Sequence, residues 1–175
     1  MKIFGIGMFK TGTKSLGEAL SILGYRTNAN FWAAVDNNWY PSEEEYSDSL
    51  LEIYERATEY DAFCDAPWMF VYKELDKEFP HSKFILTTRD YEGLATSEYK
   101  MWKRSGASIS EVPSRHRFIE RIRNHDRYVR EYFEGRDEDL LNLNICEGEG
   151  WEKLCPFLGV EETPSHLFPY ENKGE

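Results

Sequence analysis

Cysteine is scarce in this sequence, with Cys64, Cys146 and Cys155 the only three among 175 residues. Three cysteines at wide spacing provide neither a disulfide framework nor the paired ligand pattern of a zinc site. We therefore expect buried or half-buried thiols that are kept reduced, which favours a cytoplasmic protein.

Positive charge is also in short supply, because 21 lysines and arginines stand against 32 aspartates and glutamates and the net charge is −11. Such an acidic chain lacks the broad basic surface needed to bind nucleic acid or an anionic membrane, so neither partner is expected. A few local cations can still hold an anionic ligand against this background.

Long hydrophobic runs are absent as well. No apolar stretch has the length needed to cross a bilayer. The segment from Met1 to Gly5 lacks the apolar core and the small-residue cleavage site of a secretory signal, so we expect no signal peptide.

Hydrophobic residues nevertheless make up 41% of the chain and aromatic residues 15%, which is enough for a packed core. The length suits one domain with one core. We therefore expect a single domain that covers residues 1–175.

Short apolar runs alternate with stretches of helical periodicity along the chain. The expected strands cover residues 2–7, 61–65, 83–88 and 140–145. The expected helices cover residues 16–23, 43–60, 71–79, 91–104, 115–133 and 151–158. Because parallel strands need crossover helices, this order predicts an α/β fold: a three-layer α/β/α domain with a mainly parallel sheet.

Residues 7–15 (Gly-Met-Phe-Lys-Thr-Gly-Thr-Lys-Ser) connect the first expected strand to the first expected helix. Backbone N–H groups at the start of a helix point toward a bound anion, and the helix dipole favours its negative charge. Gly12 permits a tight turn close to that anion. Further donors or charges come from Lys10, Thr11, Thr13, Lys14 and Ser15. The segment therefore predicts a phosphate-binding loop.

The position of the lysines argues against an ATP-binding loop. The nucleotide-kinase pattern is Gly-x4-Gly-Lys-Ser/Thr, and Gly7 and Gly12 have the right separation for it. However, Thr13 occupies the lysine position, and Lys14 comes one residue late, which is about 100° of rotation on a helix. The other cation, Lys10, lies before the second glycine.

A second group of donors follows the expected strand at 83–88. Arg89 stands at the carboxyl end of that strand, where open α/β sheets bind ligands, and a guanidinium can hold a phosphate with two N–H groups. Ser97, eight residues later, can add a hydroxyl donor from the next helix. The alternative interpretation is that Arg89 pairs with Asp90 or Glu92 at the surface.

The two groups together resemble the donor site of sulfotransferases that use PAPS (3′-phosphoadenosine 5′-phosphosulfate). The run from Lys10 to Ser15 is similar to the family's 5′-phosphosulfate loop, and Arg89 with Ser97 is similar to its 3′-phosphate site. Phe9 replaces the family's proline, and Lys14 replaces its second threonine. The resemblance implies a P-loop nucleoside triphosphate hydrolase-like (sulfotransferase) fold, PAPS as co-substrate, and no metal.

The resemblance also implies roles in the transfer. Lys10 matches the loop lysine at the sulfuryl group, where it stabilises charge on the leaving oxygen. Asp65, which precedes Ala66-Pro67, stands where cytosolic members have a histidine in a His-Leu-Pro run, and it is the candidate general base. A free aspartate has a pKa of about 3.9 and is a weak base. The alternative is that Asp65 caps a helix that starts near Pro67.

The helix expected at 115–133 is strongly amphipathic, and we expect Tyr128 on its inner side. Its many arginines, which continue to Arg136, indicate either an ion-paired solvent face or cations that meet the cofactor or an anionic acceptor.

The aromatic residues at 30–40 can line an acceptor pocket or hold a loop in place. The chain has four histidines, His81, His116, His125 and His166, and we expect most of them to face solvent. The tail at 161–175 is expected to lie on the surface.

The expected activity is transfer of a sulfuryl group to a hydroxyl or amine of a small-molecule or glycan acceptor. One alternative is an ATP-dependent small-molecule kinase in which Ser15 or Asp65 contacts Mg²⁺. Another is a non-catalytic protein that binds a nucleotide, such as PAP (the desulfated form of PAPS), because a fold does not guarantee an activity.

Overall fold

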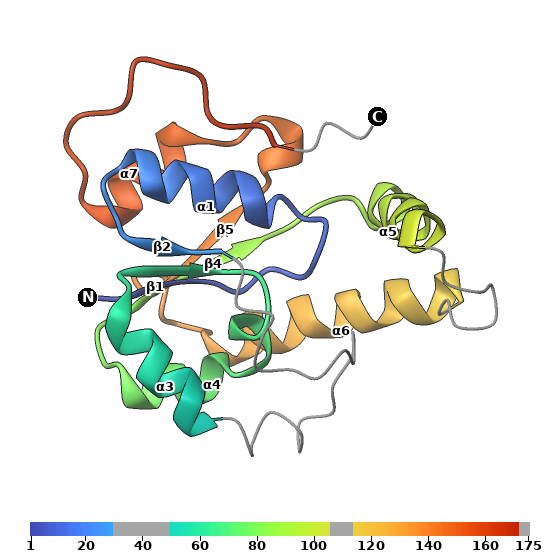
Figure 1. Ribbon diagram of the computed structural model, residues 1–175, viewed down its shortest axis with the longest axis horizontal. Coiled ribbons are helices and arrows are strands. Elements are labelled where there is room, and N and C mark those ends of the chain that lie inside the picture. Colours follow the sequence, from blue (N-terminus) through green and yellow to red (C-terminus); the bar gives the residue numbers. More distant parts are fainter. Residues whose placement is uncertain (30–49, 106–113, 172–175) are drawn as a thin grey trace.

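The computed structural model of this protein describes residues 1–29, 50–105 and 114–171. A five-stranded sheet with the order β2-β3-β1-β4-β5 forms its centre (Figure 1). All four pairings between these strands are parallel. The strands are β1 (Ile3–Gly5), β2 (Thr27–Asn28), β3 (Ala62–Cys64), β4 (Lys83–Thr87) and β5 (Leu140–Leu143).

Helices cover both faces of the sheet, which confirms the predicted three-layer α/β/α arrangement. On one face lie α1 (Thr13–Ile22) and α7 (Trp151–Leu158), and on the other lie α3 (Leu50–Glu59), α4 (Tyr72–Glu78) and α6 (Arg115–Tyr132) (Figure 1). The helix α5 (Tyr91–Ser105) follows β4 and lies beyond the carboxyl ends of the strands. Two short 3-10 turns, η2 (Trp68–Phe70) and η3 (Ile145–Glu147), complete the described elements.

The alternation of side chains along β1 divides the interior into two clusters. Ile3 packs with Leu20 of α1 and Leu154 of α7. Phe4 faces the opposite way, and its ring lies 5.1 Å from the ring of Phe63 and 5.5 Å from that of Phe84. The parallel strands are therefore buried on both faces, which explains why they appear in the sequence as continuous apolar runs.

The observed elements agree with the predicted strands and helices to within a few residues at most ends, with two exceptions. The short strand β2 was not predicted, because two residues are too few to show a periodicity. Residues 43–49 of the helix predicted at 43–60 lie outside the described residues, and α3 begins at Leu50. The three cysteines are free, with Cys64 and Cys155 buried and Cys146 half-buried, as predicted. Within the described ranges, no helix is both long and apolar enough to cross a membrane.

The inner face of α6 differs from the prediction. Phe118, Ile122 and Val129 are buried as expected, but Tyr128 is 50% exposed. Tyr128 lies six residues after Ile122, which is about 120° around the helix. The inner position is taken instead by Asp126, whose exposure is only 6%. A charged side chain in that position is not expected from an apolar pattern.

Burial of the Asp126 carboxyl is energetically unfavourable, because only one of its two oxygens is hydrogen-bonded in the described part of the chain. The Tyr91 hydroxyl donates to its Oδ2 at 3.3 Å, whereas its Oδ1 has no hydrogen-bond partner among the described residues. Burial raises the pKa of Asp126 to about 6, against the opposing effects of the Tyr91 hydrogen bond and of the positive charge of Arg130. The ionised carboxylate is therefore disfavoured in the folded protein.

We predict that Asp126→Asn stabilises the protein more at pH 7 than at pH 4. Because the pKa of Asp126 is raised on folding, the unfolded chain loses this proton first, and wild-type stability declines as the pH rises from about 4 to about 6. The variant has a neutral side chain at this position and does not show this decline. The free energy of unfolding of the variant, minus that of the wild type, therefore increases by about 1–3 kcal/mol over that range. Urea denaturation at both pH values measures the difference. Asp137→Asn, at an exposed position, serves as the control and should show a much smaller change. A pH-independent difference for Asp126→Asn would contradict the prediction.

Candidate functional site

The predicted strand–loop–helix arrangement is present at residues 3–22. The chain leaves β1 at Gly5 and enters α1 at Thr13, and Gly12 adopts φ 102° immediately before the helix. The first turn of α1 contains no acidic residue, so its free N–H groups face no competing negative charge from their own helix. The start of α1 therefore has the geometry and the local charge that suit an anion.

Two contacts hold this loop against the end of β4. A Cβ atom at Gly7 would lie 2.0 Å from Thr87 Oγ1 and 2.4 Å from the Thr87 carbonyl oxygen, so only glycine fits there. The hydroxyl groups of Thr11 and Thr87 share a hydrogen bond of 2.6 Å, and both side chains are fully buried. Thr11 is therefore a structural anchor of the loop, and Thr87 is a site residue that the sequence motifs did not identify.

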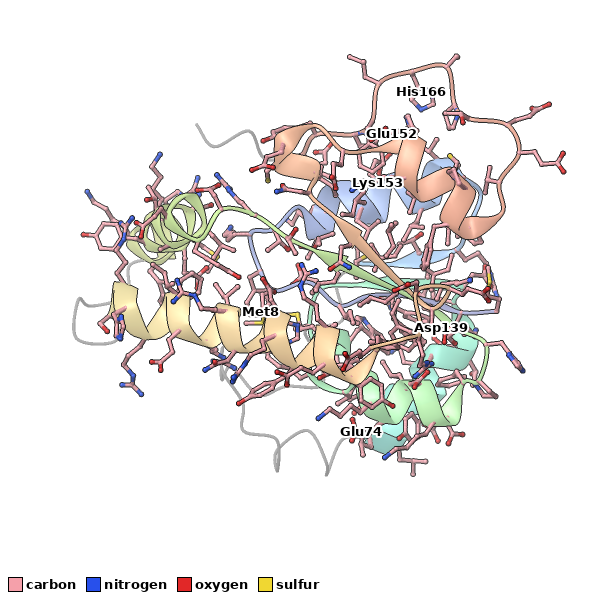
Figure 2. All side chains as sticks on the ribbon, turned by 180° about the vertical axis from the view of Figure 1, so that it is seen from behind. Met8, Glu74, Asp139, Glu152, Lys153 and His166 are labelled. Carbon is pink, nitrogen blue, oxygen red and sulfur yellow. The ribbon has the colours of Figure 1, made fainter. Side chains whose placement is uncertain are left out.

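The helix α6 supports the other side of the loop. His125 Nε2 lies 2.8 Å from the carbonyl oxygen of Ile6, and because a carbonyl only accepts, Nε2 carries the hydrogen. Met8 is buried in the same cluster as Phe118 and Ile122, and Figure 2 shows its side chain beside α6. His125 is thus an exception to the expectation that most histidines face solvent: burial lowers the pKa of its ring, against the opposing effect of the Ile6 hydrogen bond, and the nearby positive charge of Arg121 lowers it further.

Lys10 and Asp65 share an unusual backbone conformation. Lys10 has φ 67° and Asp65 has φ 75°, and of the non-glycine residues that the structure describes, His81 alone joins them in this left-handed region. The conformation costs an L-residue about 1–2 kcal/mol. Such strain persists where the surrounding structure imposes it, and it clusters at functional sites. The two residues proposed for chemistry follow two adjacent parallel strands, β1 and β3.

The Asp65 carboxyl lies at the carboxyl end of β3 with only 7% exposure. The Ala66 N–H donates to its Oδ1 at 3.1 Å, and the Thr13 hydroxyl donates to its Oδ2 at 3.4 Å. Burial raises the pKa of Asp65, although both hydrogen bonds and the positive charges of Lys14 and Lys10 oppose the rise. A carboxylate with a raised pKa is a stronger base than a free aspartate.

The expected alternative role of Asp65 as a helix cap is not observed. The turn η2 is preceded by Pro67 and has no side-chain capping hydrogen bond. The Asp65 carboxyl bonds instead to the adjacent Ala66 N–H and, across the site, to Thr13 of the phosphate loop. This carboxyl therefore connects the end of β3 to the start of α1.

The Lys10 side chain is half-buried, and burial lowers the pKa of its ammonium. The largest opposing effect comes from the Glu98 carboxylate, with a smaller one from Asp65. Glu98 lies on α5 directly after Ser97, is 4% exposed, and accepts a hydrogen bond of 3.0 Å from Trp102 Nε1. The sequence motifs did not identify Glu98, although its i,i+4 spacing from Trp102 was a visible sign of a paired side chain.

The remaining loop donors differ in accessibility. Lys14 is exposed, whereas Ser15 is buried and its Oγ accepts a hydrogen bond of 2.9 Å from the Glu171 N–H. The Ser15 hydroxyl keeps its own hydrogen, which it can donate to an anion. The tail thus reaches the start of α1, a contact that the sequence did not reveal. Trp151 holds this tail through a hydrogen bond of 2.9 Å to the His166 carbonyl oxygen.

Arg89 follows β4, and Ser97 lies on α5 as predicted. Arg89 Nε lies 3.4 Å from Asp90 Oδ1, so the expected surface pair is present. The Asp90 carboxylate also accepts from the Gly93 N–H at the start of α5. Because a guanidinium has five N–H donors, the pair with Asp90 leaves Arg89 capacity for a further anion. Within the described residues, no group of three or more His, Cys, Asp or Glu side chains has an arrangement that would hold a metal ion.

Comparison with known protein families gives a match over almost the full length of the chain. The sulfotransferase domain matches it in two overlapping segments, residues 2–108 and 94–175. The first segment contains the phosphate loop, Asp65 and Arg89, and both segments contain Ser97. No curated protein matches the sequence.

We predict that Thr87→Val loosens the phosphate loop. Valine keeps the volume but removes the hydroxyl that pairs with Thr11, so the free energy of unfolding should fall by about 1 kcal/mol. Amide hydrogen exchange at residues 10–12 should also accelerate. Thr96→Val is the matched control, because the Thr96 hydroxyl is exposed and donates to the Glu92 carbonyl oxygen of its own helix. Unchanged exchange in the loop would show that the hydroxyl pair does not anchor it.

Proposed function

The chain belongs to the sulfotransferase family, and we propose that it transfers a sulfuryl group from PAPS to a hydroxyl or amine of a small-molecule or glycan acceptor. The observation that carries this proposal is the placement of Lys10 and Asp65. Both are held in a left-handed backbone conformation at the ends of adjacent strands, beside the start of α1.

The start of α1 is the proposed binding site for the 5′-phosphosulfate of PAPS. Backbone N–H groups at Gly12, Thr13 and Lys14 and the hydroxyl of Ser15 supply donors. The 3′-phosphate is assigned to Arg89 and Ser97, which lie on the opposite side of β1 from Asp65 because β4 and β3 flank that strand. The two phosphate sites thus belong to neighbouring parallel strands, at the edge where open α/β sheets bind ligands.

In the proposed reaction the acceptor oxygen or nitrogen attacks the sulfur of PAPS. A new bond to sulfur forms, and the bond from sulfur to the 5′-phosphate oxygen breaks, which leaves PAP. Lys10 stabilises the negative charge that grows on the leaving oxygen. Asp65 takes the proton that the acceptor loses, and its raised pKa makes it a stronger base for this step.

The first prediction of this proposal is that PAP binds in the presence of EDTA and without a divalent cation. Arg89→Ala should weaken this binding about 10- to 100-fold, because a hydrogen-bonded contact to a charged group contributes about 1.5–3 kcal/mol. Isothermal calorimetry with PAP, and separately with ATP and Mg²⁺, measures the difference. Arg26→Ala is the control, since Arg26 pairs with Asp61 at the amino end of β3, away from the carboxyl ends of the strands where the proposed phosphate sites lie. Absence of PAP binding to the wild type would contradict the proposal, and Mg²⁺-dependent binding of ATP alone would favour a kinase.

The second prediction concerns the base. Asp65→Asn should lower kcat about 10²- to 10⁴-fold with little change in the KM for PAPS. Asparagine tolerates the left-handed backbone, and its amide oxygen can still accept from the Ala66 N–H. Wild-type kcat should increase as the pH rises through the raised pKa of Asp65, and the variant should lack this step.

Labelled PAPS tested against a library of phenols, amines and sugars provides the assay for that step. Asp61→Asn, at the start of the same strand, is the control and should retain activity. An Asp65→Asn enzyme with near-wild-type kcat would remove Asp65 from the mechanism. Intact PAP binding with no transfer to any acceptor would favour the non-catalytic alternative.

A further inference from the structure

The tail at residues 161–171 is held to the body of the protein by an aromatic anchor. Trp151, the first residue of α7, donates from Nε1 to the His166 carbonyl oxygen at 2.9 Å, and its ring lies 4.7 Å from the Phe168 ring. A Cβ atom at Gly150 would lie 2.9 Å from Phe168, so the tail packs directly against the backbone there. These contacts fix residues 166–168, although the tail forms no helix or strand.

From this anchor the tail continues to the start of α1. Figure 1 shows that it leaves the end of α7, arches over that side of the sheet and returns toward the phosphate loop. There the Glu171 N–H donates to Ser15 Oγ at 2.9 Å, between residues 156 positions apart. The tail therefore delivers one backbone donor to a residue of the proposed phosphosulfate site.

The hydrogen bonding of Ser15 is unusual for a serine in a helix. Such a hydroxyl often donates to the carbonyl group four residues earlier, as the Ser21 hydroxyl does to the Gly17 carbonyl oxygen at 3.0 Å. Ser15 is only 2% exposed and instead accepts from the tail. Among the residues that the structure describes, its hydroxyl donates to none. A buried hydroxyl at the third position of α1 thus has its hydrogen available.

The contact with the tail determines where that hydrogen can point. A hydroxyl has one hydrogen and two lone pairs, and the Glu171 N–H occupies one lone pair of Ser15 Oγ. The hydrogen must therefore point away from the tail. An accepted hydrogen bond also polarises the hydroxyl, which makes it a better donor. Without the tail, the hydroxyl could rotate and donate to a carbonyl group of its own helix.

We propose that the tail positions the Ser15 hydroxyl as a donor to the bound phosphosulfate, so that Trp151 and Phe168 are positioning residues for the donor site. The inference rests on the proposed function, because it adds a remote support to that same site. The anchor acts in two steps: Phe168 holds the tail, and the Glu171 N–H, three residues further along, orients the hydroxyl. The affinity of the start of α1 for an anion then depends on an aromatic contact at α7.

Calorimetry with PAP tests this dependence. Phe168→Ala removes the ring that holds the tail and should weaken PAP binding about 3- to 10-fold, as expected for the loss of one hydrogen bond. Phe168→Tyr keeps the ring and should retain the wild-type affinity. Leu167→Ala is the matched control, because Leu167 is the neighbouring residue of the same tail and is 92% exposed. The NMR signal of the Trp151 Nε1–H group reports whether the tail is seated in each variant.

A second variant displaces the tail without removing a packed side chain. Gly150→Ala adds a methyl group where Phe168 lies, and the φ of −161° at Gly150 is an extended conformation that alanine also adopts. It should weaken PAP binding as Phe168→Ala does. Unchanged or tighter binding of PAP by both variants would overturn the inference, because the tail would then be irrelevant to the anion or in competition with it.

A double-mutant cycle distinguishes positioning from a general structural effect. Ser15→Ala should weaken PAP binding about 10-fold or more, because it removes a donor to a charged group. In the Ser15→Ala background, Phe168→Ala should cause less than about 2-fold further loss, since no hydroxyl is left for the tail to orient. The same loss in both backgrounds would show that the tail acts by another route and would overturn the inference.

Titration with inorganic sulfate separates this inference from the proposed function. The amide NMR signals of Thr13 and Lys14 report binding of sulfate at the start of α1. If PAP does not bind the wild type, but sulfate binds there and Phe168→Ala weakens it only when Ser15 is present, the positioning role stands and the use of PAPS fails. If PAP binds and the variants are indifferent or additive, the donor site stands and the positioning role fails. Binding of neither anion would overturn both.

Discussion

The close approach of the loop after β1 to the end of β4 is the constraint on which the site depends. The two strands pair in parallel with Gly5 opposite Ile85, and this register brings Gly7 against the backbone of Thr87. No side chain fits between them, so only glycine allows the loop to approach the end of β4 this closely. The buried bond between the Thr11 and Thr87 hydroxyls then fixes the loop that leads into α1. Any anion at the start of α1 therefore meets a preformed set of donors, which reduces the conformational entropy lost on binding.

The electrostatics of the site follow from this rigid loop. Burial makes the ammonium of Lys10 easier to deprotonate and the carboxyl of Asp65 easier to protonate, so the pKa values of the two groups move toward each other. Glu98 offsets part of the effect on Lys10 from the side of α5. The negative charges of Glu98 and Asp65 thus favour the protonated form of Lys10, against the burial that disfavours it. The strained backbone of Lys10 and Asp65 is maintained because both follow strands whose positions in the sheet are fixed.

Local patterns were sufficient for most of the fold. Apolar runs at β1, β3 and β4 and the helical spacing in α1 and α7 reflect burial that each segment shows by itself. The misassigned side chains lie where burial is decided by distant neighbours. Tyr128 looks like a core residue in the sequence, yet the inward direction of α6 is set by its packing on the sheet, and that direction brings in Asp126 instead. His125 is half-buried, and its ring donates to the carbonyl oxygen of Ile6, a contact between residues 119 positions apart that no local pattern shows.

The sequence by itself predicted the alternation of strands and helices, the loop at Lys10 to Ser15 between the first strand and the first helix, Asp65 and Arg89 at the ends of strands, and Ser97 on the following helix. These features are local, since hydrogen bonding within a helix and the period of a strand depend on nearby residues. Only the tertiary structure decided that Thr87 anchors the loop, that Glu98 offsets the burial of Lys10, and that Arg121 lies over Phe70. Those relations join segments that are far apart in the chain, and they arise because a parallel sheet brings the carboxyl ends of successive strands to one edge.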